Sequence, residues 1–340
     1  MTYEELAAKA RGTMGPICNA CPICNGRHCG SHIPGPGAKG SGNVACRNQE
    51  AWKDYRLAMD TIHEGFTAST ETEVLGRTLS LPVMVAPIGD VTRHYGDRYD
   101  TATYNRLMLT GAYEAGTLGW TGDGLGADLG KESFDIIDEL DGAGIATIKP
   151  WSMDRVLALV DEALAVRPAA VAMDVDAAGL PFLRGQQPPA GAKKISELRE
   201  VAHRCHAAGI PFIVKGIMTE RGAEKALRAH ADAIVVSNHG GRVLDGVPAT
   251  AEVLHDIASA VGRDVEILVD GGIRSGIDVF RALALGAHAV LMCRPFVVAT
   301  FGGGSEGVHD YLSQLASELV DAMEMCGAEH VEDINRDMLW

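Results

Sequence analysis

Eight short apolar runs, most of them followed by a stretch of helical periodicity, constrain the fold of this chain most strongly. The runs lie at residues 81–87, 117–121, 146–150, 169–176, 211–216, 232–238, 266–270 and 289–293. Continuous apolar runs are typical of strands that are buried on both faces, and strands that alternate with helices favour parallel pairing. Eight such units in a row predict a closed (β/α)8 TIM barrel. A doubly wound open sheet is the structural alternative.

The barrel accounts for residues 81–340, and residues 1–80 are expected to form an N-terminal extension. Residues 1–15 have the pattern of a short helix. Residues 16–47 are so rich in Gly, Pro and Cys that we expect no regular element of any length there. One large domain with an extension is the economical division of a chain of 340 residues.

Composition argues against several classes of partner. A formal net charge of −15 disfavours unspecific binding to nucleic acid or to an anionic membrane. No apolar stretch is long enough to span a bilayer, and residues 1–13 carry acidic side chains where a secretion signal would have an apolar core. We therefore expect a cytoplasmic protein that acts on a small molecule.

Four of the eight cysteines crowd into the extension with the spacing C-x2-C-x2-C-x4-C. They are Cys18, Cys21, Cys24 and Cys29. The spacing is similar to ferredoxin runs, although the last gap is one residue longer and no proline follows Cys29. An iron–sulfur cluster, a structural zinc and a loop of reduced thiols all remain open, and the pattern favours a bound metal. His28 and Cys46 are spare ligands.

The carboxyl ends of barrel strands are where TIM-barrel enzymes place their chemistry. These ends carry Ala86, Pro87, Thr121, Lys149, Asp174, Asp176, Lys215, Ser237, His239, Asp270, Gly271, Gly272 and Arg294. His239 follows one strand and Arg242 lies three residues later. A base that titrates near neutral pH beside a permanent cation suits proton abstraction from a hydroxy or keto acid. The structural alternative is a hydrogen-bonded loop histidine with a surface arginine, but the two glycines after His239 favour close approach to a ligand.

An anionic ligand is indicated by four cations near the same strand ends, namely Lys215, Arg242, Arg274 and Arg294. The segment ILVDGGIRSG ends a strand and starts a helix near Ser275, so backbone N–H groups can receive a phosphate. TIM barrels often bind phosphate with the loops after their last two strands. Tight turns that only close the barrel would explain the glycines but not both Arg274 and Arg294.

Three segments, VKGIMT, SNHGGRVLDGVPAT and DGGIRSGIDVFRALALGAHAVLMCRPF, resemble the FMN-dependent α-hydroxy-acid dehydrogenases, the group that includes glycolate oxidase, lactate oxidase and mandelate dehydrogenase. The similarity runs from about Leu81 to the C-terminus and is most specific from Ile210 onward. It implies a TIM barrel that binds FMN and an enzyme of the EC 1.1 class.

The resemblance also implies roles for single residues. Lys215 matches the lysine near the flavin pyrimidine, His239 the catalytic base and Arg242 the clamp on the substrate carboxylate. Asp176 falls where the family has a partner for the histidine, although Asp174 permits a register two residues off. Ala86, Pro87 and Ile88 match the segment behind the flavin, and Asp270, Gly272, Arg274 and Arg294 match the phosphate and ribityl contacts. Thr121, Lys149, Ser237, Gly271 and Cys293 complete the predicted cofactor-binding set.

The substrate side departs from the family pattern. Lys149, Pro150 and Trp151 stand in place of the usual Gln-x-Tyr, so Trp151 becomes a candidate substrate contact. Arg184 is an approximate match for a second substrate arginine.

The preferred hypothesis is FMN-dependent oxidation of a small 2-hydroxy acid, similar to lactate or glycolate, to the 2-keto acid. An iron–sulfur cluster in the extension would pass electrons to an acceptor protein instead of oxygen. The alternatives are an FMN-dependent isomerase similar to type 2 isopentenyl diphosphate isomerase and a non-catalytic flavin or metal sensor. The family suggests a homotetramer.

Overall fold

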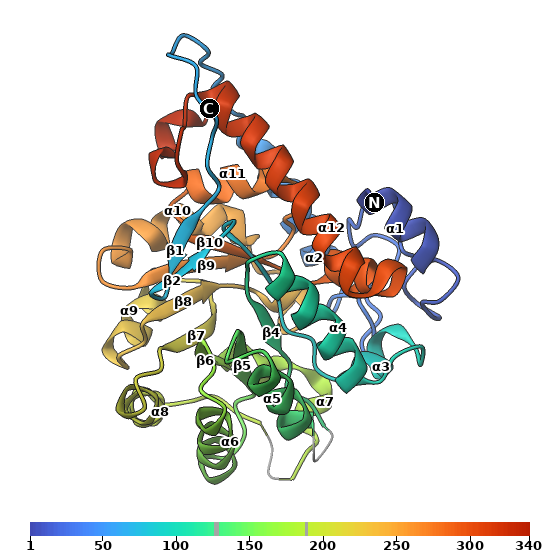
Figure 1. Cartoon of the computed structure of the whole chain (residues 1–340). Coiled ribbons are helices and arrows are strands. Elements are labelled where there is room, and N and C mark those ends of the chain that lie inside the picture. Colours follow the sequence, from blue (N-terminus) through green and yellow to red (C-terminus); the bar gives the residue numbers. More distant parts are fainter. Residues whose placement is uncertain (126–128, 188–189) are drawn as a thin grey trace.

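The computed structural model describes residues 1–125, 129–187 and 190–340, and its centre is a closed barrel of eight parallel strands (Figure 1). The strands are β3 (Val83–Val85), β4 (Gly119–Thr121), β5 (Gly144–Ile148), β6 (Ala170–Asp174), β7 (Phe212–Ile217), β8 (Ala233–Val236), β9 (Glu266–Asp270) and β10 (Ala289–Met292). They pair in chain order, and β10 closes the barrel on β3. The predicted (β/α)8 barrel is confirmed, and the open-sheet alternative is wrong.

Alternate residues of each strand serve two hydrophobic cores. In β8, Ala233 and Val235 belong to the core inside the barrel, whereas Ile234 and Val236 pack in the core between the strands and the helices. Successive strand side chains point to opposite faces, so both faces must be apolar when both are covered. This double burial explains why the strands appear in the sequence as continuous apolar runs.

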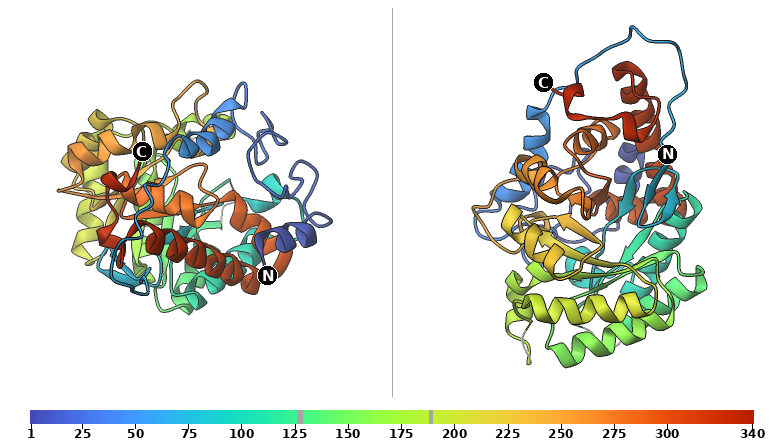
Figure 2. Two further views of the ribbon diagram at one scale, coloured as in Figure 1. Left: turned by 90° about the horizontal axis from the view of Figure 1, so that it is seen from above. Right: turned by 90° about the vertical axis from the view of Figure 1, so that its left-hand side faces the viewer.

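The helices cover the outside of the barrel. They are α3 (Val91–Tyr95), α4 (Thr101–Glu114), α5 (Leu129–Glu139), α6 (Met153–Ala165), α7 (Pro181–Arg184), α8 (Ile195–Ala207), α9 (Glu220–Arg228), α10 (Thr250–Val261), α11 (Gly276–Ala284) and α12 (Arg294–Cys326). The long α12 is kinked at Gly304 and packs against α4 and α11 (Figures 1 and 2). Among the described helices, none is both long enough and apolar enough to cross a membrane.

Strand β5 ends two residues before the end of its apolar run. The run at residues 146–150 predicted a strand through Pro150, but β5 ends at Ile148. The backbone N–H of Lys149 donates to the Asp123 carboxylate at 2.8 Å, so it is not available to a neighbouring strand. The chain therefore leaves the barrel sheet one residue after Ile148.

The N-terminal extension contains α1 (Tyr3–Ala10), α2 (Asn43–Ala51), a 3-10 turn (Trp52–Asp54) and a hairpin of β1 (Thr72–Val74) and β2 (Arg77–Leu79). Leu6, Ala7 and Ala10 form the buried face of α1, which packs beside α12. The expectation that residues 16–47 contain no regular element is wrong at their end, because α2 begins at Asn43. Residues 57 and 69 form isolated bridges to Leu339 and His330, near the C-terminus.

Helix α2 and the turn after it lie on the carboxyl end of the barrel. The side-chain amides of Asn48 and Asn238 exchange hydrogen bonds of 2.7 and 2.8 Å, and the Trp52 indole donates to the Gly271 carbonyl at 2.8 Å. Both barrel partners lie in loops that follow strands, β8 and β9. The boundary at residue 80 stays a prediction, and these contacts tie the extension to the mouth of the barrel.

Candidate active site

A cavity opens at the carboxyl ends of the strands, with about 1010 Å³ of empty space including its mouth. Thirteen of the predicted site residues line it, and they come from six strand ends and the loops that follow them. They are Ala86, Pro87, Ile88, Lys149, Lys215, His239, Arg242, Asp270, Gly271, Gly272, Arg274, Cys293 and Arg294.

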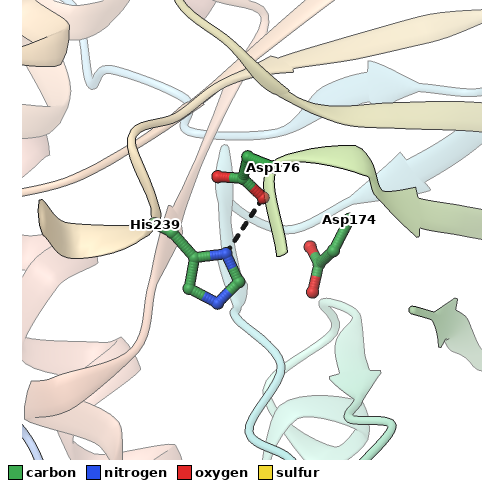
Figure 3. A group of neighbouring side chains, drawn as sticks. All are labelled: Asp174, Asp176 and His239. Carbon is green, nitrogen blue, oxygen red and sulfur yellow. Dashed lines mark hydrogen bonds and ion pairs between the residues drawn. The ribbon is translucent and has the colours of Figure 1, made fainter. Parts of the chain in front are cut away.

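His239 begins the 3-10 turn His239–Gly241 that follows β8. Its Nδ1 atom lies 3.0 Å from Oδ1 of Asp176 (Figure 3), and Nε2 makes no hydrogen bond to the described residues. Burial lowers the pKa of His239, although the Asp176 carboxylate acts to raise it. The imidazole is therefore neutral near pH 7, with Nε2 as the ring nitrogen that can accept a proton.

Asp174 and Asp176 lie two residues apart and have different partners. Lys149 donates to Oδ2 of Asp174, and Lys215 Nζ lies 3.3 Å from Oδ1 of the same side chain. Asp176 instead reaches His239 (Figure 3). The geometry thus brings Asp176, and not Asp174, to the histidine.

Lys215 is a buried ammonium held between carboxylates. Its Nζ atom lies 3.2 Å from Oδ2 of Asp270 and 3.3 Å from Oδ1 of Asp174. Burial acts to lower the pKa of Lys215, but Asp174 and Asp270 together raise it above its ordinary value. The ammonium of Lys215 therefore places a fixed positive charge in the lining of the cavity.

The three arginines of the cavity are held by backbone carbonyls. Arg242 Nη1 donates to the carbonyls of Gly35 and Gly37, and Arg294 Nη2 donates to Gly240 at 2.9 Å. Arg274 Nε donates to the Cys24 carbonyl at 2.7 Å. A guanidinium group has five N–H donors, so these contacts orient each group and leave further donors for a ligand. Most of the anchoring carbonyls belong to the N-terminal extension.

The residues around Asp270 fit the phosphate and ribityl chain of FMN. Oδ1 of Asp270 is buried and has no hydrogen-bond partner among the described residues, so it can accept from a ligand hydroxyl. Arg274 and Arg294 line the cavity next to the backbone of Gly271 and Gly272. Two arginines and a glycine turn before the N-terminus of α11 form a site for a phosphate.

Five predicted site residues do not line the cavity: Thr121, Asp176, Ser237, Arg184 and Trp151. Ser237 contacts two cavity residues, because its hydroxyl accepts a hydrogen bond from Lys215 Nζ at 3.2 Å and another from the backbone N–H of His239. Arg184 donates to the Ala178 carbonyl, and the buried Trp151 indole donates to Asp123. In this structure Arg184 and Trp151 therefore lie outside the cavity in which a substrate would bind.

Several cavity residues escaped the sequence reasoning, notably His94, Tyr95, Asp123 and Phe182. Asp123 comes two residues after β4, so a search one step beyond the strand ends would have found it. His94 and Tyr95 lie on the five-residue helix α3, and Phe182 lies on the four-residue helix α7. No periodic pattern marks such short helices.

The four clustered cysteines border a second pocket beside this cavity, and Tyr95 and Arg294 line both. Within the described ranges, no three of these sulfur atoms lie within 4.8 Å of one another. Among the described His, Cys, Asp and Glu side chains, the one group of three whose ligand atoms lie this close together is Asp174, Asp176 and His239. Lys149 and Lys215 already neutralise Asp174 in that group. The cysteines therefore do not form an assembled tetrahedral site for a single zinc ion.

Comparison with known proteins gives a consistent result. The family model described as FMN-dependent dehydrogenase matches residues 36–181 and 169–340. The chain is 35% identical over 329 residues to a 4-hydroxymandelate oxidase of Amycolatopsis orientalis, covering 86% of this chain and 89% of that protein. It is 50% identical over 129 residues to an L-lactate dehydrogenase of Yersinia pestis (strain Pestoides F), which is 38% of this chain and 34% of the relative.

Solved structures of a mandelate oxidase have the same fold. The structure with (S)-2-phenylpropionate is 27% identical, with a TM-score of 0.78 over 99% of this chain and 97% of that one. The structure with benzoyl-formic acid is 29% identical, with a TM-score of 0.75 over 89% of this chain and 90% of the other. The family match begins at residue 36, so the expected start of the similarity near Leu81 was too late.

Proposed function

Since the chain belongs to the FMN-dependent dehydrogenase family, we propose that it oxidises a 2-hydroxy acid with an apolar side chain to the 2-keto acid, with His239 as the base. The coarser assignment to FMN-dependent 2-hydroxy-acid oxidases and dehydrogenases follows from the family match and from the oxidase that is similar over most of the chain. The observation that carries the proposal is that His239, which is hydrogen-bonded to Asp176, lines one cavity together with Arg242.

The residues that would hold FMN are those of the last two strand ends. Arg274, Arg294 and the backbone of Gly272 would bind its phosphate, and Asp270 would accept from a ribityl hydroxyl. Bound FMN would supply the acceptor for the two electrons that leave the substrate. The ammonium of Lys215 would place positive charge beside the part of the cofactor that becomes more negative.

Arg242 would bind the substrate carboxylate. Its Nη1 group is occupied by Gly35, so the remaining N–H groups would face the ligand. A hydrogen bond to a charged partner contributes about 1.5–3 kcal/mol. This contact would orient the substrate so that its hydroxyl group lies near His239.

His239 would accept the hydroxyl proton at Nε2. Burial keeps the imidazole neutral before the reaction, and Asp176 would hold the ring and stabilise the imidazolium that forms. A base placed in this way commonly contributes about 10²- to 10⁴-fold in rate. The proton would thus leave through His239, which, of the described histidines that line the cavity, is the one with a carboxylate partner.

The cavity lining supports a substrate with an apolar side chain. Leu125, Leu180 and Phe182 line the same cavity as His239 and Arg242. Lactate and mandelate have an apolar group to bury against these side chains, whereas glycolate has none. Glycolate is therefore expected to be the poorest substrate of the three.

The use of an acceptor protein for the electrons and the assembly of the chain into a homotetramer stay predictions.

The test is to mix the protein anaerobically with glycolate, lactate or mandelate and to measure reduction of the flavin as the loss of its visible absorbance. We expect bleaching in the natural protein, and none in His239→Ala, which should retain its FMN because the phosphate residues are unchanged. The matched control is His206→Ala, which removes a histidine that pairs with Asp232 at 2.7 Å outside the cavity. Bleaching of His239→Ala at the natural rate would remove His239 from the reaction. An isomerase or a sensor would show no bleaching in any variant.

A further inference from the structure

The four clustered cysteines face one small pocket. Cys18, Cys21, Cys24 and Cys29 all line it, with about 380 Å³ of empty space including its mouth. The fifth cysteine of the extension, Cys46, does not line the pocket. The lining therefore contains the four cysteines of the C-x2-C-x2-C-x4-C spacing and leaves out Cys46.

The spread of the sulfur atoms distinguishes between kinds of metal centre. In a tetrahedral zinc site, Zn–S bonds of about 2.3 Å place the sulfurs roughly 3.8 Å apart. In a four-iron cluster the four cysteines are bound around a group of several atoms, so their sulfurs lie farther apart than around a single ion. Within the described residues no three of the sulfurs lie within 4.8 Å of one another, although all four cysteines line the same pocket. This arrangement is too open for one tetrahedral zinc ion, so a group bound by all four sulfurs would have to be larger than a single ion.

Positive charge lies next to this pocket. Arg274 Nη2 is 3.7 Å from Cys24 Sγ, and its Nε donates to the Cys24 carbonyl at 2.7 Å. Arg294 also lines the pocket. Four thiolates around a cluster leave net negative charge, and partly buried arginines can neutralise it and donate hydrogen bonds to its sulfurs.

We propose that Cys18, Cys21, Cys24 and Cys29 bind a four-iron, four-sulfide cluster in this pocket. Each thiol would lose its proton and bind one iron atom. This site does not depend on the proposed substrate, because its ligands are separate from His239 and Arg242.

The position of the site suggests a use, and this part rests on the proposed function. Tyr95 and Arg294 line both the cysteine pocket and the flavin cavity, so the two sites share a wall. Oxidation of a 2-hydroxy acid to a 2-keto acid releases two electrons and two protons. A cluster carries one electron at a time, so two molecules of a one-electron acceptor protein of higher potential than the hydroxy acid, such as a cytochrome, would be reduced in each turnover, and the protons would pass to solvent.

The test is the iron, zinc and sulfide content of the full chain purified without oxygen, before and after incubation with iron and sulfide. We expect about four iron and about four sulfide per chain, with a low-temperature electron paramagnetic resonance signal after reduction by dithionite. Cys21→Ala and Cys24→Ala should lose most of the iron and the signal. Cys46→Ala is the matched control and should retain both, and the far-ultraviolet circular dichroism of each variant reports whether it has folded.

One zinc per chain without sulfide, or neither metal in the natural protein, would overturn the cluster proposal, and so would equal loss of iron in Cys46→Ala. A second arm adds lactate or mandelate in place of dithionite. If dithionite produces the signal and no hydroxy acid bleaches the flavin, the proposed function fails while the cluster site stands; if hydroxy acids bleach the flavin without producing the signal, electron transfer to the cluster is overturned. If hydroxy acids bleach the flavin and no iron is found, the reverse holds.

Discussion

At the scale of single residues, the site depends on two aspartates, Asp174 and Asp176, that have different partners. Asp174 is the last residue of β6, and Asp176 lies in the 3-10 turn Val175–Gly179 that follows. Residues two apart in a continuing strand would point to the same face. Since the strand ends at Asp174, the turn redirects Asp176 toward His239 while Asp174 stays on the lysines. The sequence left both registers open for this reason.

Asp176→Asn should lower kcat/KM about 10²-fold or more, because the imidazolium loses its carboxylate partner. The carboxylate acts to raise the pKa of His239, so its removal should lower that pKa further. A base is active when it is neutral, and the acid limb of the pH profile should therefore move to lower pH. The measurement is kcat/KM between pH 4.5 and 8, in units of about 0.5.

The control for this variant is Asp232→Asn, which alters the exposed pair with His206 and should leave both the rate and the acid limb unchanged. An acid limb that stays in place in Asp176→Asn would show that the Asp176 carboxylate does not set the pKa of the catalytic base.

At the scale of elements, α2 and the loop after β9 pack so closely that one position has no space for a side chain. Gly272 has a φ of +85°, and a Cβ atom there would lie 1.9 Å from the Asn48 carbonyl oxygen. Gly76, in the β1–β2 hairpin, has a similar φ of +69° with nothing within 4 Å of its Cβ position. The two glycines share a backbone conformation and differ in their surroundings.

Gly76→Ala should cost only the backbone strain of the left-handed region, about 1–2 kcal/mol in the free energy of unfolding. Gly272→Ala should cost more, because α2 must also move, and it should weaken FMN binding by displacing the phosphate loop. Urea unfolding and FMN titration of both variants measure these effects. Equal unfolding free energies with equal FMN affinities would contradict the close contact with α2.

At the scale of the whole molecule, the extension forms part of the wall of the barrel cavity. His94 on α3 accepts a hydrogen bond from the Gly35 backbone at 3.0 Å, and Gly35 also holds Arg242. Burial, followed by the positive charge of Arg242, lowers the pKa of His94 to about 3. The hydrogen bond from Gly35 of the extension is therefore accepted by a neutral imidazole, that of His94 on the barrel side.

This histidine should make the folded protein sensitive to acid. Its unfolded pKa is near 6.5, so below that pH the unfolded chain binds a proton that the folded chain does not. Its contribution to stability is present above pH 6.5 and is lost by about 1.4 kcal/mol per unit as the pH falls toward 3. His94→Asn keeps an acceptor for Gly35 without this proton.

The difference in unfolding free energy between His94→Asn and the natural protein should therefore change with pH. We expect the variant to gain relative stability between pH 6.5 and pH 4.5 in urea unfolding experiments, by about 1.4 kcal/mol per unit. His330→Asn, which changes an exposed histidine, is the control. Parallel curves for His94→Asn and the natural protein would show that His94 takes up its proton in the folded state.

The sequence by itself determined the barrel and the strand-end residues, because burial on both faces forces the apolar runs and parallel pairing brings every strand end to one mouth. Hence His239, Lys215, Arg242 and Arg294 could be placed on one cavity in advance. Only the tertiary structure decided what irregular segments do. It paired His239 with Asp176, added the cavity residues of α3 and α7, and set the cysteine loop against Arg274. Such contacts join residues far apart in the chain through loops without a period, so no local pattern encodes them.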